Sequence, residues 1–298
     1  MPNLSQFDIT GRVAVVTGGA GLLGAEFCEV LAEAGARVVV ADISQEAASQ
    51  VANRLNEKYT DESLGSRGVC SLAIDTDVTS KASVARLIDA TLDAFGRLDI
   101  LINTAAIDPK FDPGHLGELG ERDESQKEHS ISPGDYHTTF ENYPLELWNQ
   151  ALEVNLTGMF LCCQAVARPM LEQNKGVIVN LSSIYGLVGP DQRIYQRPDR
   201  PVKYKPVYYS VTKAAVLGLT RYLATYYAGK GIRVNALTPG GVDNEHDPDF
   251  VKAYSARTVL GRMARKDEMN GALLFLASDA SSYMTGANLV VDGGWTAW

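Results

Sequence analysis

The 298-residue chain lacks an excess of positive charge. It contains 27 Lys and Arg residues against 36 Asp and Glu residues, a formal net charge of −9, and its pI is near 5.0. Because such a chain carries no overall cationic field to attract a polyanion, we expect no nucleic-acid partner. Any anion that the protein binds must therefore be held by a local group of donors.

Cysteine is scarce, and its spacing fits neither a metal site nor a redox motif. No CxxC pair occurs, and each cysteine lies in an apolar context, where a free thiol behaves as a small hydrophobe. The histidines His115, His129 and His137 also lack tight metal-ligand spacing, which favours surface histidines. We expect no metal, a reducing cytoplasmic location, and structural roles for Cys28, Cys70, Cys162 and Cys163.

Long apolar runs and linkers are also missing. No run reaches the roughly 18 residues of a membrane span, and Met1 to Thr10 contain no apolar core flanked by positive charge. These absences predict a protein that is neither membrane-bound nor secreted. Because no proline- or serine-rich linker and no internal repeat divides the chain, a single domain over residues 1–298 is the simplest organisation.

Short β-branched runs alternate with stretches of helical apolar spacing throughout the chain. This alternation predicts βαβ units and an α/β fold with a parallel, doubly wound sheet. The expected strands are Val13 to Val16, Val38 to Ala41, Val69 to Ile74, Ile100 to Ile102, Val177 to Leu181, Val234 to Leu237 and Leu289 to Val291. The expected helices include Ala25 to Ala34, Lys81 to Phe95, Pro144 to Asn174 and Tyr208 to Ala228.

Local signals mark helix ends and two insertions. Ser80 is expected to cap a helix N-terminus, and Gly35 and Gly96 to end two helices. Asp108 to Tyr143 is polar and punctuated by proline and glycine, and Val188 to Pro206 is densely basic. Both segments (about 108–143 and 188–206) are interpreted as surface insertions into the domain, the first as a lid or an oligomer contact.

A glycine-rich turn follows the first expected strand, in the sequence Thr17-Gly18-Gly19-Ala20-Gly21-Leu22-Leu23-Gly24. Its glycines let the backbone turn sharply and approach a pyrophosphate, which the N–H groups and dipole of the following helix attract. The flanking strand and helix distinguish this phosphate cradle from a simple tight turn. We expect a dinucleotide cofactor against Gly18, Gly21, Leu22, Leu23 and Gly24.

Asp42 stands just after the second expected strand, 18 residues beyond Gly24. A carboxylate at this position accepts hydrogen bonds from the adenosine ribose hydroxyls and repels a 2′-phosphate. The glycine turn contains no basic residue, and Ile43 follows the carboxylate. These features favour NAD over NADP; a solvated Asp42 without a ligand is the alternative.

Tyr209 and Lys213 are four residues apart, so they share one face of an expected helix. A free tyrosine has a pKa near 10, and a fixed positive charge nearby favours the phenolate. Tyr209 is therefore predicted to be a general acid/base. Ser183 follows an expected strand and would hydrogen-bond the substrate oxygen at the carboxyl edge of the sheet. A Tyr-x-x-x-Lys pair alone is more often a surface pair, but its combination with Ser183 and the glycine turn favours catalysis.

With these motifs in this order, the chain resembles the short-chain dehydrogenase/reductase family from Gly11 to Asp292-Gly293-Gly294-Trp295. The resemblance implies a Rossmann-type domain, direct hydride transfer with NAD(H), and a homodimer or homotetramer. It also implies that Asn155, in Asn155-Leu156-Thr157-Gly158, holds a water that links Lys213 to solvent. The implied catalytic tetrad is Ser183, Tyr209, Lys213 and Asn155.

The same resemblance implies further cofactor contacts. Asp77-Val78 is similar to the pair that holds the adenine ring, and Asn103-Thr104-Ala105-Ala106 to the family's Asn-Asn-Ala-Gly segment. Pro239-Gly240 follows the sixth expected strand, as in the loop that covers the nicotinamide. The implied contacts are Asp77, Val78, Asn103, Ala105, Tyr209, Lys213, Pro239, Gly240 and Val242.

Several residues depart from the family pattern. Leu22 occupies the middle position of the usual Gly-x-x-x-Gly-x-Gly motif, and the resulting Gly-x-x-Gly-x-x-Gly spacing is more similar to the extended, sugar-nucleotide branch. Thr104 and Ala106 replace Asn and Gly, and Asn244 stands where a threonine often contacts the carboxamide. These departures affect individual contacts and leave the family resemblance in place.

Tyr209 lies 26 residues after Ser183, a longer gap than in single-domain relatives. We expect the extra residues to lie beside the active site and to contribute to substrate specificity. The basic residues of this segment predict an anion clamp of Arg193, Arg197 and Arg200; a solvated charged loop is the alternative. The C-terminal tail is similar to oxidoreductases of bacterial surface-sugar pathways. The predicted reaction interconverts a secondary alcohol and a ketone on a carbohydrate derivative, an anionic or nucleotide-linked sugar.

Two other functions are weighed against this one. A 3-oxoacyl thioester reductase would usually take NADPH, which Asp42 disfavours, and would not need the basic insertion. A non-catalytic scaffold would keep the fold without needing the complete set of four catalytic side chains.

Overall fold

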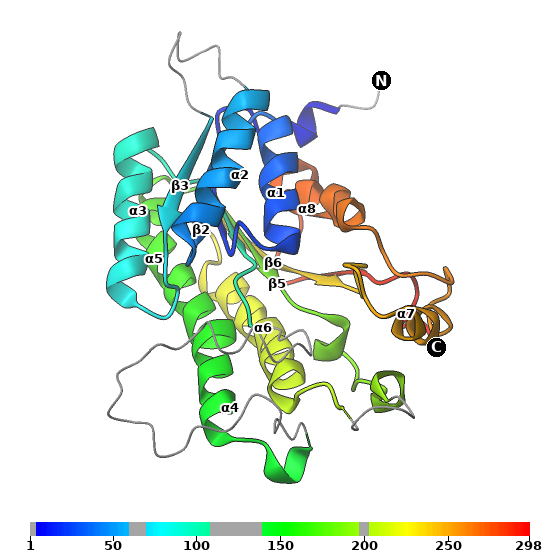
Figure 1. The fold of residues 1–298 in the computed structure, drawn as a ribbon. Helices are drawn as coiled ribbons and strands as arrows, with labels where there is room; N and C mark the ends of the chain where they lie inside the picture. Colours follow the sequence, from blue (N-terminus) through cyan, green and yellow to red (C-terminus); the bar gives the residue numbers. More distant parts are fainter. Residues whose placement is uncertain (1–3, 60–69, 108–138, 197–202) are drawn as a thin grey trace.

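A computed structural model describes residues 4–59, 70–107, 139–196 and 203–298 (Figure 1). Its strands are β1 (Val13–Thr17), β2 (Arg37–Asp42), β3 (Ser71–Asp75), β4 (Ile100–Asn103), β5 (Gly176–Leu181), β6 (Ile232–Pro239) and β7 (Asn288–Val291). They form one sheet of order β3-β2-β1-β4-β5-β6-β7 in which all neighbours are parallel. The predicted doubly wound, seven-stranded sheet is confirmed, and its order reverses between β1 and β4.

The helices pack on both faces of this sheet (Figure 1). They are α1 (Leu22–Glu33), α2 (Gln45–Lys58), α3 (Lys81–Phe95), α4 (Leu145–Leu152), α5 (Met159–Glu172), α6 (Val207–Tyr226), α7 (Pro248–Ser255) and α8 (Asn270–Ala277). Val16 and Val40 point to the face covered by α1, α2 and α8, whereas Val15 and Val39 point to the face covered by α3, α5 and α6. Successive strand residues thus enter opposite cores, which is why the strands read as continuous apolar runs.

The helix-end signals in the sequence are confirmed. The Ser80 side chain accepts a hydrogen bond from the Ser83 N–H at the start of α3. Gly96 and Gly35 follow α3 and α1 with φ of +72° and +87°, the left-handed conformation that glycine adopts without strain.

One predicted helix is interrupted. The apolar spacing over Pro144 to Asn174 predicts a continuous helix, but α4 and α5 are joined by a π-helical turn, η6 (Glu153–Gly158). The turn fits closely against its neighbour, since a Cβ on Gly158 would lie 2.7 Å from Val78 Cγ2. The apolar spacing over the whole segment indicated a helix but not this local change of backbone hydrogen bonding.

Smaller differences concern element ends and helices that the sequence analysis did not predict. Pro239 is the last residue of β6, not the first of the following loop, and β3 begins at Ser71. The helices α2, α7 and α8 were not predicted. The helix α2 has few apolar residues, among them the buried Val51 and Leu55, so its mostly polar sequence shows only a weak helical pattern.

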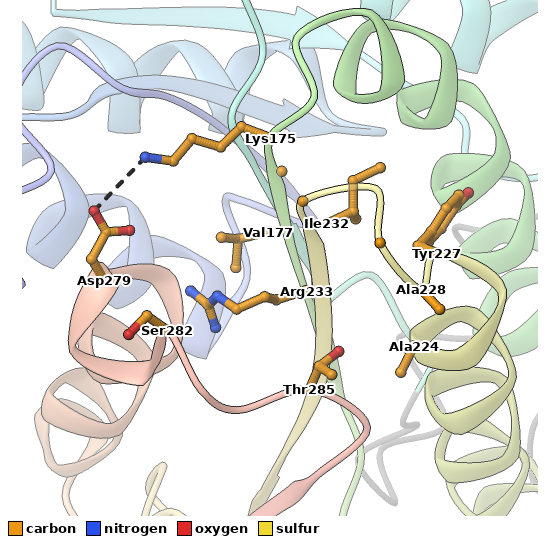
Figure 2. Close-up of a pocket in the computed structure, with 13 residues that line it drawn as sticks. Lys175, Val177, Ala224, Tyr227, Ala228, Ile232, Arg233, Asp279, Ser282 and Thr285 are labelled. Atoms are coloured by element: carbon orange, nitrogen blue, oxygen red, sulfur yellow. Dashed lines mark ion pairs between the residues drawn. The ribbon is translucent and has the colours of Figure 1, made fainter.

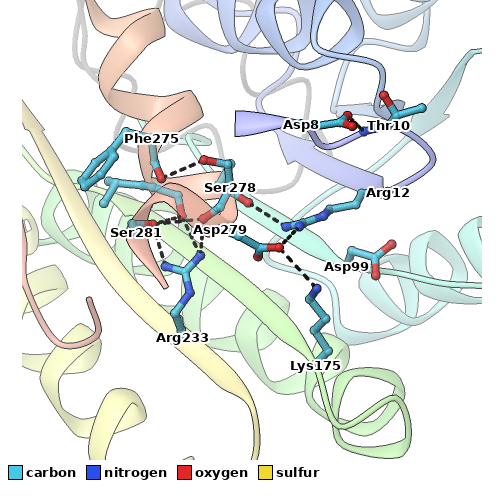
Figure 3. A network of polar contacts seen from close by, with 12 residues as sticks. Asp8, Thr10, Arg12, Asp99, Lys175, Arg233, Phe275, Ser278, Asp279 and Ser281 are labelled. Atoms are coloured by element: carbon cyan, nitrogen blue, oxygen red, sulfur yellow. Dashed lines mark hydrogen bonds and ion pairs between the residues drawn. The ribbon is translucent and has the colours of Figure 1, made fainter. Parts of the chain in front are cut away.

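Two arginines fix the end of α8 to the amino edge of the sheet (Figure 3). Arg233 donates to the carbonyl oxygens of Leu276 (3.2 Å) and Ser278 (2.8 Å), and Arg12 donates to Asp279 Oδ2 (2.6 Å). Burial lowers the pKa of Arg233. Both guanidinium groups satisfy acceptors at a helix C-terminus, where the helix dipole also favours positive charge.

The cysteines lie inside the protein, as the sequence predicts. Cys28, Cys70, Cys162 and Cys163 are all buried with free thiols. Burial raises the pKa of Cys162 to about 12, so this thiol stays protonated and unreactive near neutral pH. Within the described ranges, no helix is both long enough and apolar enough to cross a membrane.

Candidate active site

The predicted site residues gather at the carboxyl edge of the sheet. Thr17, Asp42 and Asn103 end β1, β2 and β4, Ser183 follows β5 after one intervening residue, and Pro239 ends β6. Because the strands are parallel, these ends meet along one edge, where α/β folds bind their ligands.

The glycine turn after β1 is tightly packed against the loop after β4. Gly18 has φ +63°, and a Cβ there would lie 2.8 Å from Ala105 Cα. A Cβ on Gly24 would lie only 2.0 Å from the Gly18 carbonyl oxygen. Side chains at these two positions would open the turn, so the sequence needs glycine for a structural reason that operates whether or not a ligand is bound.

The turn leads into α1 in a way that suits a dinucleotide phosphate. The first i to i−4 hydrogen bond of this helix runs from the Ala25 N–H to the Gly21 carbonyl oxygen. The N–H groups of Leu22, Leu23 and Gly24 therefore precede the helical bonding pattern and lie at the positive end of its dipole. This cradle fits the pyrophosphate of a nicotinamide dinucleotide, and the Leu22 side chain at its entrance is exposed.

Asp42 is half-buried and braces the cradle. Its Oδ2 accepts a hydrogen bond from the Ala20 N–H (3.0 Å), and its Oδ1 accepts one from the Ser44 N–H (3.1 Å). The carboxylate thus connects the glycine turn to the end of β2. Asp42 is therefore not the solvated side chain without structural contacts that was the alternative. An ionised carboxylate has about four acceptor sites, so two backbone bonds leave capacity for hydroxyl donors.

Asp77 and Val78, which the family resemblance assigns to the adenine, are held in place by neighbouring residues of the chain. Asp77 Oδ1 accepts hydrogen bonds from the N–H (2.9 Å) and hydroxyl (2.7 Å) of Thr79, and Val78 is buried against Gly158. Asn103 points elsewhere: its Nδ2 donates to Asn180 Oδ1 (2.9 Å) inside the core. The Asn103 side chain therefore links β4 to β5 inside the core. A cofactor contact of this residue would be made by its backbone.

Tyr209 and Lys213 lie one turn apart on α6, as predicted. The Lys213 Nζ is 5.8 Å from the centroid of the Tyr209 ring and donates a hydrogen bond to the carbonyl oxygen of Leu181 (2.9 Å). Lys213 is 3% exposed. Anchoring at the end of β5 fixes this buried ammonium close to the tyrosine and limits its screening by water.

Ser183 is held beside the same part of α6. It begins the 3-10 turn η7 (Ile184–Gly186), where its Oγ accepts a hydrogen bond from the Tyr185 N–H (3.2 Å). The neighbouring Ser182 Oγ donates to the Lys213 carbonyl oxygen (2.8 Å), and a Cβ on Gly186 would lie 2.6 Å from the Lys213 backbone. The structure thus brings Ser183, Tyr209 and Lys213 together, although 30 positions separate the first from the last in sequence.

Asn155 lies in the π-helical turn η6 and is 1% exposed. Its Oδ1 accepts a hydrogen bond from the Ile107 N–H (2.6 Å), and its Nδ2 donates to the Ile107 carbonyl oxygen (3.1 Å) and to Thr212 Oγ1 (3.4 Å). Thr212 is the neighbour of Lys213, so Asn155 connects the loop after β4 with the turn of α6 that carries Tyr209 and Lys213.

Sequence reasoning missed an aromatic wall around Tyr209. The Tyr185 ring meets the Tyr209 ring edge-on at 6.5 Å and shares a hydroxyl hydrogen bond with Tyr195 (2.8 Å). Trp295 stacks on Tyr254 at 4.3 Å and contacts Tyr185 at 6.4 Å. These residues come from distant segments, so no spacing signal joins them; only Trp295 belonged to a recognised motif.

A second contact with Tyr209 was also missed. The Lys205 Nζ lies 4.0 Å from the centroid of the Tyr209 ring, nearer than the Lys213 Nζ. Lys205 belongs to the basic insertion, for which the sequence predicted only arginine contacts.

The described part of the predicted anion clamp is already paired. Arg193 donates to Asp191 (2.8 Å), and Arg257 pairs with the same carboxylate. The Arg193 hydrogen bond, with the nearby Arg257 charge, lowers the pKa of Asp191 to about 2. Arg197 and Arg200 lie outside the described residues, as do the insertion histidines His115, His129 and His137. The described chain contains no group of acidic, histidine or cysteine side chains suited to a metal.

Two surface pockets of the described residues lie at opposite edges of the sheet. The larger, about 310 Å³, is at the amino ends of β5 and β6 between Lys175, Arg233 and Tyr227 (Figure 2). The smaller, about 140 Å³, lies at the carboxyl ends of β6 and β7, and Gly240 and Tyr254 are among its lining residues. Since the predicted catalytic side chains lie at the carboxyl edge, the larger pocket lies at the opposite edge from them.

Comparison with known proteins decides the family. A family profile described as short chain dehydrogenase matches residues 12–255. The chain belongs to the short-chain dehydrogenase/reductase family. This short-chain dehydrogenase/reductase is an oxidoreductase that acts on CH–OH groups with a nicotinamide cofactor.

Individual relatives share the full length of this dehydrogenase. The cis-4-hydroxycyclohexanecarboxylate dehydrogenase of Sinomonas cyclohexanicum is 38% identical over 291 residues, covering 96% of this chain and 97% of the relative. The D-threitol dehydrogenase of Mycolicibacterium smegmatis is 34% identical, covering 97% and 95%. The crystal structure of a gluconate 5-dehydrogenase from Burkholderia cenocepacia with NADP and tartrate is 30% identical, with a TM-score of 0.78 and 99% coverage of both chains.

Proposed function

We propose that this enzyme oxidises the secondary alcohol of a hydroxylated carboxylate or polyol to a ketone with NAD, and catalyses the reverse reaction with NADH. The observation that carries the proposal is the placement of Tyr209 beside the buried Lys213, with Ser183 held next to the same turn of α6. This arrangement is a proton-transfer site at the ligand-binding edge of the sheet.

In the proposed mechanism, Tyr209 exchanges a proton with the substrate oxygen. A nicotinamide cofactor held by the glycine turn would supply the hydride acceptor for oxidation and the hydride donor for reduction. During oxidation the alcohol O–H proton passes to the Tyr209 phenolate as the C=O bond forms. Lys213 stabilises that phenolate, and the Ser183 hydroxyl holds the substrate oxygen.

Asn155, the fourth member of the proposed catalytic tetrad, is proposed to position the other parts of the site. Its amide joins Ile107 on the cofactor side to Thr212 on the catalytic helix, so it holds the two halves of the site in register. The water that it would hold beside Lys213 remains a prediction from the family resemblance.

One feature supports NAD as the preferred cofactor. Asp42 retains acceptor capacity beside the glycine turn, where it would receive the ribose hydroxyls and repel a 2′-phosphate. The cradle would place the pyrophosphate at the N–H groups of Leu22, Leu23 and Gly24. The adenine would lie near Asp77 and Val78, and the nicotinamide near Pro239, Gly240 and Val242.

The substrate class rests on the site and on the relatives' names. Tyr185 packs edge-on against Tyr209, and Tyr195 and Trp295 contact Tyr185, so aromatic rings border the proposed proton-transfer group. Such a border suits a substrate with an apolar face. The relatives named above act on a hydroxycyclohexanecarboxylate, threitol and gluconate, which are hydroxylated carboxylates or polyols. Arg193, Arg197 and Arg200 remain the proposed contacts for a substrate anion.

The experiment is a cofactor and substrate panel followed by NADH absorbance. cis-4-Hydroxycyclohexanecarboxylate, gluconate and threitol would be tested with NAD and with NADP, and an acetoacetyl thioester with NADH and NADPH. We expect turnover of a hydroxylated carboxylate or polyol with NAD. Turnover of the thioester alone with NADPH would replace this proposal by a 3-oxoacyl thioester reductase.

A triple variant tests the anion clamp on whichever carboxylate is turned over. Changing Arg193, Arg197 and Arg200 to alanine should raise KM by about tenfold or more, because each lost charge-assisted hydrogen bond is worth over 1 kcal/mol. The KM for a neutral polyol and the kcat should stay near wild type. An unchanged KM for the carboxylate would leave the solvated-loop interpretation.

A further inference from the structure

Lys205 is fixed over the face of the tyrosine that the proposed function makes the proton-transfer group. It stands two residues before α6, at the end of the basic insertion. Its backbone is held from both sides: the Lys205 N–H donates to Gln192 Oε1 (2.8 Å), and Gln192 Nε2 donates to the Lys205 carbonyl oxygen (3.4 Å). Gln192 therefore fixes the backbone from which the Lys205 side chain reaches Tyr209.

The distance makes Lys205 a stronger neighbour of the ring than Lys213. The Nζ atoms lie 4.0 Å and 5.8 Å from the Tyr209 ring centroid, respectively. A cation over an aromatic face is attracted by the ring, and the attraction increases when the ring carries the delocalised charge of a phenolate. Lys205 and Tyr209 are both partly buried, which weakens screening by water.

The other described groups around the ring come from α6, η7 and the aromatic wall. Lys213 comes from the same helix, and Ser183 and Tyr185 come from η7. Tyr254 packs further along the aromatic wall, and burial raises the pKa of its hydroxyl, which keeps it neutral. Of the described neighbours, Lys205 and Lys213 each bring an ammonium group to the Tyr209 ring.

We propose that Lys205 is a positioning residue for catalysis, whose ammonium over the Tyr209 ring stabilises the phenolate and sets the lower pH limit of activity. The inference rests on the proposed role of Tyr209 in proton transfer. It gives the second insertion a function in the reaction itself, in addition to any contact with the substrate.

The first test is a spectroscopic titration that needs no substrate. The absorbance of tyrosinate would be followed against pH in wild type and Tyr209→Phe, and the difference isolates Tyr209 from the other tyrosines. The same difference would be taken between Lys205→Met and the Lys205→Met, Tyr209→Phe double variant. We expect Tyr209 to ionise at a pH higher by roughly one unit without Lys205, since an opposite charge at this distance has an effect of that size.

The second test is the pH profile of kcat/KM for alcohol oxidation, with any alcohol that is turned over. The acidic limb should move up by roughly one pH unit in Lys205→Met and stay near wild type in Lys205→Arg. Lys230→Met is the matched control, because it removes the same charge from an exposed loop before β6. The circular dichroism and Tm of all variants would establish that they fold.

The outcomes separate this inference from the proposed function. An unmoved tyrosinate titration in Lys205→Met overturns the inference, as does a variant whose KM rises for carboxylates alone, which would assign Lys205 to substrate binding. If Tyr209→Phe loses turnover while Lys205→Met is unshifted, only the role of Lys205 fails. If Tyr209→Phe keeps wild-type turnover, the proposed function fails as well.

Discussion

The two edges of the sheet use cationic side chains in opposite ways. At the amino edge, Arg12 and Arg233 donate to carbonyl oxygens at the end of α8, and Lys175 lies 3.7 Å from Asp279 (Figure 3). At the carboxyl edge, Lys205 and Lys213 face the ring of Tyr209. The residue types are alike, but the first group closes a helix end and the second lies against the ring of the proposed proton-transfer tyrosine. The role of a cation follows from the group that it faces.

The same contrast explains why the size of a pocket does not identify the active site of this protein. The pocket between Lys175 and Arg233 is more than twice the volume of the one beside Gly240, yet its arginine already serves backbone acceptors (Figure 2). We expect changes at the amino edge to alter stability and changes at the carboxyl edge to alter catalysis. The predictions below test this division, beginning with the largest effect.

Removing the Tyr209 hydroxyl should give the largest change. Tyr209→Phe deletes the proposed proton-transfer group and should lower kcat/KM about 1,000-fold, a typical contribution of general acid/base catalysis. The Tm and the affinity for NADH should stay close to wild type, as measured by calorimetry and fluorescence titration. Tyr283→Phe, at a fully exposed tyrosine, is the matched control and should be unaffected. Retained turnover in Tyr209→Phe would contradict the assignment of the active site.

Arg233→Met should separate stability from catalysis at the other edge. The variant leaves the carbonyl oxygens of Leu276 and Ser278 without this donor, which should lower the free energy of unfolding by roughly 2 kcal/mol. Urea denaturation measures this loss, and kcat at a temperature where the variant is folded should match wild type. Arg168→Met, at an exposed i,i+4 pair, should change stability far less. A large fall in kcat with unchanged stability would remove the proposed division between the edges.

Asp42→Ser should change cofactor preference. Loss of a charge-assisted hydrogen bond to the ribose should lower kcat/KM for NAD by about 10- to 100-fold, and loss of the negative charge should improve use of NADP. Asp75→Ser is a suitable control, because Asp75 lies beside Asp42 in the sheet register but is exposed. The two cofactors would be compared at saturating substrate. An unaltered ratio of NAD to NADP use would show that Asp42 only braces the glycine turn.

Asp191→Asn should have the smallest effect, and that effect should depend on pH. Hydrogen bonding to Arg193 lowers the pKa of Asp191 in the folded protein to about 2, from an ordinary value of 3.8. The ionised carboxylate therefore adds stability that is complete above pH 3.8 and disappears as pH falls toward 2. The Tm difference between wild type and Asp191→Asn should be largest near neutral pH and shrink below about pH 4. Asp89→Asn, at an exposed site on α3, should show little difference at either pH; a constant gap for Asp191 would refute the linkage.

Part of the site was accessible from local sequence. The glycine turn was predictable because Gly18 and Gly24 must lack side chains for the turn to close, so the requirement appears directly as residue type. Tyr209 and Lys213 were predictable because helical geometry places residues four apart on one face. Ser183 was predictable because the end of a parallel strand lies at the ligand-binding edge. Each of these signals spans only a few residues.

Other parts depend on contacts between distant segments. The ring wall of Tyr185, Tyr254 and Trp295 joins residues over 100 positions apart, and no local pattern encodes that meeting. The family resemblance implies a cofactor contact for Asn103, and only the structure shows that its side chain turns into the core to bond Asn180. Strand position predicts the edge at which a residue lies, and the surrounding side chains decide where it points.

The sequence by itself determined the alternating fold, the edge of the sheet that carries the chemistry, and the local motifs that identify the family, because these depend on backbone geometry and on spacing within one element. Tertiary structure alone decided that Arg233 serves a helix end, that η6 presents Asn155 to both halves of the site, and that Lys205 lies over Tyr209. These roles arise from the distance and burial of groups brought together by packing. The physical reason is that an electrostatic effect depends on separation in space and on exclusion of water, neither of which is written in the order of residues.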